Sequence, residues 1–178
     1  MEEKSSTSDD TYEYDGKTYN VVNNFNSKYC FNQKNYNRFI NASGRNTGCT
    51  ATAMCSAYSI LHDSTLSPND VKWGSAGCSW EYCNRYSDGE KTYYPYNYTQ
   101  EEALSAAYNS ISNDVPVIVG VKSVGCDHVV TIVGVRNNAS SANLSLSDFL
   151  IVDPWGGDIE ALDTYTGIDT SWSLRIPA

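Results

Sequence analysis

Residues 116–135 read Pro-Val-Ile-Val-Gly-Val-Lys-Ser-Val-Gly-Cys-Asp-His-Val-Val-Thr-Ile-Val-Gly-Val, and this stretch decides the fold class. It contains two runs dense in valine and isoleucine, Pro116–Val121 and His128–Val135. β-Branched residues in runs of this length favour strands. A third such run, Phe149–Val152, ends in Asp-Pro. The C-terminal half of the chain is therefore predicted to form a β-sheet.

The residues ahead of these strands carry helical patterns. In residues 50–62, apolar side chains recur at three- and four-residue spacing, which predicts a mostly buried helix. Ser67-Pro68-Asn69-Asp70 has the composition of a second helix start, and Thr99-Gln100-Glu101-Glu102 is a capping box ahead of a third. Helices come first and strands second. This order predicts an α+β protein whose helices pack on an antiparallel sheet.

The length of 178 residues suits one domain with a loose end. Residues 1–11 are polar and have no apolar core, so we expect a disordered linker, left where a leader was removed. Residues 12–178 are expected to form the single domain. Within it, residues 12–29 are interpreted as a strand or an extended arm, and residues 32–48 as a loop.

Composition excludes several classes of function. The net charge is -9 and no basic stripe offsets it, which disfavours nucleic-acid binding. No apolar run approaches the roughly 20 residues that a membrane span needs. Charged residues make up only 19% of the chain, and 14 tyrosines stand against 4 phenylalanines. We interpret this balance as that of a secreted or cell-surface bacterial protein, and we expect a monomer.

The six cysteines are compatible with several roles. Cys78 and Cys83 could pair with each other or remain separate core thiols. Zinc is disfavoured because there is no C-x-x-C motif and only two histidines occur. We expect neither a metal nor an organic cofactor.

Three residues could carry chemistry, and each also has an ordinary structural interpretation. Cys49 directly precedes the predicted helix, where unpaired N–H groups and the helix dipole favour a thiolate, but a lone cysteine is commonly just a small buried side chain. His128 begins a predicted strand and Asp153 ends another, although both could merely border turns. Cys126, two residues before His128, is the rival nucleophile, which we disfavour because it precedes a strand and not a helix.

Taken together, the order Cys49, His128, Asp153 matches a nucleophile, a base and an orienting acid in the order that papain-like enzymes use. The segments Gly-Cys-Thr-Ala-Thr-Ala-Met, Val-Pro-Val-Ile-Val-Gly-Val, Asp-His-Val-Val-Thr-Ile-Val-Gly-Val and Phe-Leu-Ile-Val-Asp-Pro-Trp resemble those of the C39-like cysteine peptidases. The resemblance covers roughly residues 31–157. It implies a papain-like fold, the three catalytic roles just named, and a glutamine that donates to the oxyanion, for which Gln33 is the candidate.

Two positions depart from the family pattern. Thr50 follows the cysteine where relatives usually carry glycine. Ser43 stands where the leader-processing relatives carry their glutamine, so we disfavour a double-glycine leader as the substrate. The expected function is hydrolysis of an amide bond in a peptide, a protein or a cell-wall crosslink. Acyl transfer by the same triad and a catalytically silent binding module remain alternatives; the latter would use tryptophans Trp73, Trp80, Trp155 and Trp172.

Overall fold

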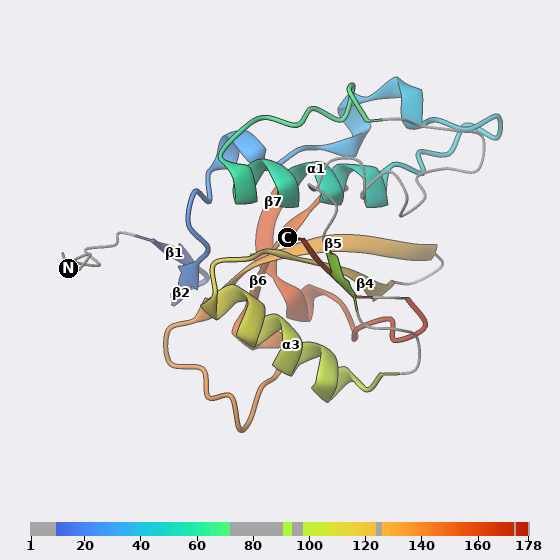
Figure 1. Cartoon of the computed structure of the whole chain (residues 1–178). Coiled ribbons are helices and arrows are strands. Elements are labelled where there is room, and N and C mark those ends of the chain that lie inside the picture. The colour runs from blue at the N-terminus through green and yellow to red at the C-terminus, as the bar shows by residue number, and fades with distance from the viewer. Residues whose placement is uncertain (1–9, 72–90, 94–97, 124–125, 173, 178) are drawn as a thin grey trace.

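The computed structural model describes residues 10–71, 91–93, 98–123, 126–172 and 174–177. Two helices and an antiparallel sheet make up this part of the chain, as the α+β prediction requires (Figure 1). The elements, in order, are β1 (Thr11–Tyr14), β2 (Lys17–Val21), α1 (Cys49–His62), β3 (Lys91–Tyr93), α3 (Gln100–Ser112), β4 (Val117–Ser123), β5 (Cys126–Arg136), β6 (Phe149–Asp153), β7 (Asp158–Ala161) and β8 (Arg175–Pro177).

The long strand β5 organises the sheet. Its residues 126–132 pair with β4, and residues 134–136 pair with β2. Along the opposite edge, residues 131–135 pair with β6, which in turn pairs with β7. Every one of these pairings is antiparallel. The β1–β2 hairpin precedes α1 in the chain, so the sheet also draws on the N-terminal segment that was expected to be a strand or an arm.

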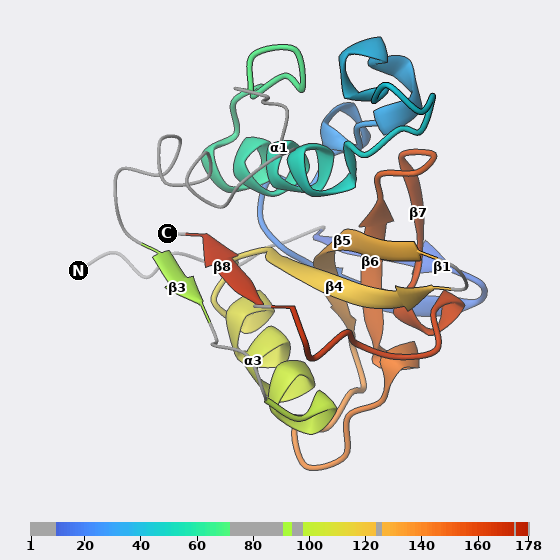
Figure 2. The same cartoon turned by 90° about the vertical axis from the view of Figure 1, so that its right-hand side faces the viewer.

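The two helices lie on opposite faces of the sheet, as Figures 1 and 2 both show. Val117, Val119 and Val121 of β4 join the apolar cluster that contains α3, whereas Ile118 joins the cluster that contains α1. Alternate side chains of one strand are thus buried on both faces. This double burial explains why the strands read as continuous apolar runs and not as the alternation usual for an antiparallel sheet with one wet face.

Both helices follow their sequence signals. Helix α1 begins one residue ahead of the predicted range, and its residues 50–60 are all buried. The capping box of α3 is confirmed, because the Thr99 N–H donates to Glu102 Oε2 over 2.7 Å and the Glu102 N–H donates to Thr99 Oγ1 over 3.1 Å. At the second predicted helix start, the Asp70 N–H donates to the Ser67 carbonyl over 2.9 Å. The residues that would continue the predicted helix lie outside the described part of the chain.

The chain ahead of α1 is held in short 3-10 turns. The segment predicted as a loop, residues 32–48, contains two 3-10 turns, Gln33–Asn35 and Asn37–Phe39. Residues 1–9 lie outside the described part, and the Asp10 carbonyl accepts a hydrogen bond from the Val21 N–H over 2.8 Å. Within the described ranges, no helix has the length and apolar character needed to cross a bilayer.

Candidate functional site

Cys49 is the first residue of helix α1, and the local packing explains why the helix begins there. Gly48 is its N-cap residue and lies against Phe39: a Cβ added to Gly48 would come within 2.2 Å of Phe39 Cδ2. Only glycine therefore fits at this position without a shift of the ring. The half-buried Cys49 stands among the unpaired N–H groups of the helix start, which favour negative charge.

His128 and Asp153 reach one another from neighbouring strands. Thr131 of β5 pairs with Val152 of β6, and the pairing is antiparallel. His128, three residues before Thr131, and Asp153, one residue after Val152, therefore lie toward the same end of this ladder. His128 Nε2 lies 2.8 Å from Asp153 Oδ1, and the two side chains are 10% and 7% exposed.

The environment of His128 favours its charged form. Burial lowers its pKa, but hydrogen bonds with Asp153 and with Cys49 outweigh that penalty and raise the pKa to about 9. Since Nε2 is occupied by Asp153, Nδ1 is the ring nitrogen left for Cys49. The structure thus brings the three residues singled out in the sequence together around one imidazole.

Asp153 is held by more donors than His128 alone. The Trp155 N–H donates to Asp153 Oδ1 over 2.8 Å, and the Tyr165 hydroxyl donates to Asp153 Oδ2. Burial by itself would raise the pKa of Asp153, but the hydrogen bonds from His128 and Tyr165 lower it to about 2. The Tyr165 ring also lies 5.7 Å from the His128 ring, centre to centre. Sequence reasoning missed Tyr165, because an isolated tyrosine past the last long strand carries no motif.

A second carboxyl, Glu160 of β7, interacts with Asp153. Glu160 pairs with Ile151 across the β6–β7 ladder. Burial, followed by a hydrogen bond and charge repulsion from Asp153, raises the pKa of Glu160 to about 7. Asp127 directly precedes His128 in the chain, Asp158 faces Asp153 across the β6–β7 ladder, and both acids are exposed.

Gln33 is 2% exposed and is held between the β6–β7 turn and the start of α1. Its N–H donates to the Pro154 carbonyl over 2.7 Å, and its Nε2 donates to Asn46 Oδ1 over 2.9 Å. Gly157 permits this docking: at φ +71 it adopts a glycine conformation, and an added Cβ would lie 2.7 Å from the Cys30 carbonyl. Sequence reasoning did not identify Asn46, since one asparagine in an asparagine-rich loop is no signal.

The described cysteines differ in their environment. Cys30 and Cys49 carry free thiols. Burial raises the pKa of Cys30 to about 12, which keeps it protonated at neutral pH. Cys55 is buried within α1. Cys78, Cys83 and the side chain of Cys126 lie outside the described residues. Where side chains are described, no group of three or more His, Cys, Asp or Glu residues is placed to hold a metal ion.

Comparison with known families agrees with this geometry. Residues 93–168 match the family model described as papain-like cysteine protease AvrRpt2. The chain is similar to papain-like cysteine proteases. The matched stretch includes His128 and Asp153, whereas Cys49 and Gln33 precede it. It supports cysteine peptidase activity in general and does not confirm the C39-like subtype. No curated protein matches the chain.

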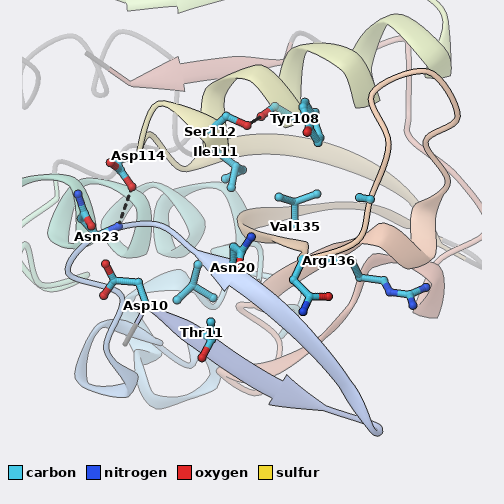
Figure 3. Close-up of a pocket in the computed structure, with 13 residues that line it drawn as sticks. Asp10, Thr11, Asn20, Asn23, Tyr108, Ile111, Ser112, Asp114, Val135 and Arg136 are labelled. Carbon is cyan, nitrogen blue, oxygen red and sulfur yellow. Dashed lines mark hydrogen bonds between the residues drawn. The ribbon is translucent and has the colours of Figure 1, made fainter. Parts of the chain in front are cut away.

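A cavity of about 640 Å³ opens far from these residues. It is lined by Val135 and Arg136 at the end of β5, by Tyr108 and Ile111 of α3, and by Asn20 of β2 (Figure 3). His128 lies at the other end of β5, and seven residues of strand separate it from Val135 by roughly 20 Å. The cavity is therefore separate from the His128–Asp153 pair.

Proposed function

We propose that this protein is a cysteine peptidase that cleaves an amide bond with Cys49 as nucleophile, His128 as general acid and base, and Asp153 as the residue that orients the imidazole. The observation that carries the proposal is the buried His128–Asp153 hydrogen bond, with Cys49 near enough to the same imidazole to help raise its pKa. A lone cysteine or a lone His–Asp pair is common in proteins. A thiol at a helix start that shares a buried imidazole with a carboxylate is the arrangement of an activated nucleophile.

In the acylation step, the Cys49 thiolate attacks the carbonyl carbon of the scissile amide and its electron pair moves onto oxygen. The His128 imidazolium then gives its proton to the departing nitrogen as the C–N bond breaks, which leaves a thioester on Cys49. A His128 pKa of about 9 supports this order of events, because the imidazole already carries the proton at neutral pH.

In the deacylation step, water attacks the thioester while the now neutral His128 takes a proton from it. The S–C bond breaks, the carboxylic product leaves, and the thiolate and imidazolium are restored. Asp153 stays ionised throughout, as its pKa of about 2 requires, and holds Nε2 so that Nδ1 faces the sulfur. Gln33 and the Cys49 N–H would donate to the oxyanion in both steps.

The finer features of this proposal rest on the sequence. The motifs around Cys49, His128 and Asp153 favour a C39-like peptidase, and the composition favours a secreted or cell-surface bacterial monomer. The substrate class we propose is a peptide or protein, including a cell-wall peptide crosslink. Fractionation of the source cells followed by immunoblotting would show in which compartment the protein is found. Recovery only in the cytoplasm would contradict the proposed location.

The test of the proposed function is Cys49→Ala combined with labelling. Brief, sub-stoichiometric iodoacetamide treatment should mark Cys49 first, and Cys49→Ala should abolish turnover of 4-nitrophenyl acetate and of protein substrates. Cys30→Ala is the matched control, because a thiol with a pKa of about 12 should label slowly and its loss should leave turnover intact.

Two other outcomes would redirect the proposal. Preferential labelling of Cys126 would move the nucleophile to β5. A wild-type protein that neither turns over acyl substrates nor reacts at Cys49, yet binds peptide or glycan, would be the catalytically silent module. Products that carry an added amine would identify acyl transfer by the same residues.

A further inference from the structure

The loop residue Asn46 joins Gln33 to the start of helix α1 through three hydrogen bonds. Asn46 Oδ1 accepts from Gln33 Nε2 over 2.9 Å and from the Gly48 N–H over 3.0 Å. Asn46 Nδ2 donates to the Gln33 carbonyl over 2.9 Å. One side chain therefore contacts both the backbone and the amide of Gln33, and also the residue that immediately precedes Cys49.

The backbone fixes which way the Asn46 amide faces. The Gly48 N–H can only donate and the Gln33 carbonyl can only accept, so the oxygen of Asn46 must face Gly48 and its nitrogen must face Gln33. That orientation presents an acceptor to the Gln33 side chain, which must then turn its nitrogen toward Asn46. The direction of the Gln33 amide thus follows from two backbone groups, with Asn46 as the intermediate.

The same contacts leave a donor available. An amide nitrogen carries two hydrogens, and Asn46 takes one of those on Gln33 Nε2. Two successive hydrogen bonds of about 3 Å place Gln33 Nε2 within about 6 Å of the Gly48 nitrogen. Gln33 Oε1 is buried and has no hydrogen-bond partner among the described residues. Within that part of the chain, the orientation of the Gln33 amide is therefore set by the bond from its Nε2 to Asn46.

We propose that Asn46 is a positioning residue for the oxyanion site: it turns the Gln33 amide so that one N–H points to the developing oxyanion beside Cys49. The inference rests on the proposed function, in which Cys49 forms an acyl-enzyme. Asn46 does not touch the substrate and acts through Gln33. Preorganised donors are the largest single contribution to many acyl transfers, so the effect on the rate should be large for a residue outside the reacting groups.

The test compares two reactions of the same sulfur. Hydrolysis of 4-nitrophenyl acetate passes through an oxyanion, whereas alkylation by iodoacetamide displaces iodide at a tetrahedral carbon and forms none. Gln33→Ala should lower kcat/KM for the ester by roughly 100-fold, on the scale of a lost oxyanion donor. Asn46→Ala should lower it by roughly 10- to 100-fold, mainly through kcat. Both variants should keep the alkylation rate of Cys49 within about twofold.

A double-mutant cycle shows whether Asn46 acts through Gln33. In the Gln33→Ala background, Asn46→Ala should have almost no further effect on ester hydrolysis. Asn41→Ala is the matched control. Asn41 Oδ1 accepts from the Ser43 and Arg45 N–H groups of the same loop, and neither of these two hydrogen bonds involves Gln33, so turnover should be unchanged. Asn46→Asp keeps the acceptor and loses the donor to the Gln33 carbonyl, and should lie between wild type and Asn46→Ala.

The outcomes separate the two proposals. Three results would each overturn the role of Asn46. The first is an effect of Asn46→Ala on ester hydrolysis that is equally large with and without the Gln33 side chain. The others are a parallel loss of the alkylation rate and full ester turnover in both Asn46→Ala and Asn46→Asp. If Asn46→Ala does not fold, Asn46→Asp still removes the Nδ2 donor, and its intermediate loss of ester turnover should disappear in the Gln33→Ala background. Full turnover by Cys49→Ala would instead overturn the proposed function itself.

Discussion

The two ends of strand β5 carry very different sites. At its start, His128 and Asp153 are nearly buried and hydrogen-bonded to one another, and Cys49 and Tyr165 complete the group. At its other end, Val135 and Arg136 border an open cavity of about 640 Å³. There the only ion pair of Arg136 that the described residues show is a loose one with Asp148, at 3.9 Å.

The comparison teaches that a cluster of buried, mutually hydrogen-bonded polar side chains indicates a catalytic site better than the volume of a cavity does. The pKa of His128 and that of Asp153 are both strongly shifted, and each shift has the other residue among its causes. Burial of an uncompensated charge costs several kcal/mol, so such a cluster persists only where its members pair. The cavity offers space and scattered polar groups but no such mutual dependence.

The largest expected effect is that of His128→Ala. Loss of the general acid and base should reduce turnover by about 10²- to 10⁴-fold and slow alkylation of Cys49 at neutral pH. His62→Ala is the matched control, because the only other histidine is exposed at the end of α1. Equal losses in both variants would mean that the start of β5 is not special.

Asp153→Ala should come next, with a 10- to 1,000-fold loss of turnover and a fold that is largely kept. The physical reason is that His128 Nε2 loses its acceptor and the imidazolium loses a neighbouring negative charge. Asp127→Ala, which removes an exposed carboxylate adjacent to His128 in the chain, should have little effect. Full activity of Asp153→Ala would instead indicate a Cys–His dyad.

Raising the pH through about 9 should weaken both turnover and folding. The pKa of His128 is raised from 6.5, so its contribution to stability is fully present below pH 6.5 and is lost as the pH rises through about 9. Turnover should fall about tenfold per pH unit above that value. kcat/KM and the unfolding midpoint should be measured from pH 8 upward. Glu160, whose pKa is about 7, is then mostly ionised and contributes little to the change. An alkaline limb that Asp153→Asn does not shift would contradict the assignment.

Tyr165→Phe should have a smaller effect, a reduction of kcat/KM by roughly 2- to 10-fold. Asp153 loses its donor on Oδ2 but keeps those on Oδ1, and its pKa should rise from about 2. The acid limb of the pH profile should therefore move upward. Tyr108→Phe, the same change at the wall of the cavity, should leave that limb in place.

The smallest effect is expected from Asp114→Asn at the cavity. Asp114 adopts φ 62 and accepts a hydrogen bond from the Asn23 N–H over 3.3 Å, and asparagine suits both the backbone angle and the acceptor role. Turnover should change less than twofold. A change of more than fivefold in acyl turnover would show that the two ends of β5 are functionally coupled.

Periodicity and cap chemistry predicted the helices and the central strands because those signals are local. Helix α1 follows from the apolar spacing in residues 50–62, and α3 from Thr99 and Glu102. The meeting of His128 with Asp153 was predicted only on the condition that β5 and β6 pair, which they do.

The residues that escaped prediction act through tertiary contacts. Tyr165 reaches Asp153 from beyond β7, and Glu160 is forced close to Asp153 by the β6–β7 ladder. Asn46 is one of many asparagines, and its importance comes from two backbone groups that only the fold brings to it. No local pattern encodes contacts of this kind.

The bond between the Gln33 N–H and the Pro154 carbonyl has a consequence for how the protein is made. Gln33 leaves the ribosome 121 residues before its docking partner Pro154. Contacts between distant segments form after the intervening chain is complete. A nascent chain that still lacks the β6–β7 turn therefore cannot form this contact, and the proposed site is complete only after Pro154 has emerged.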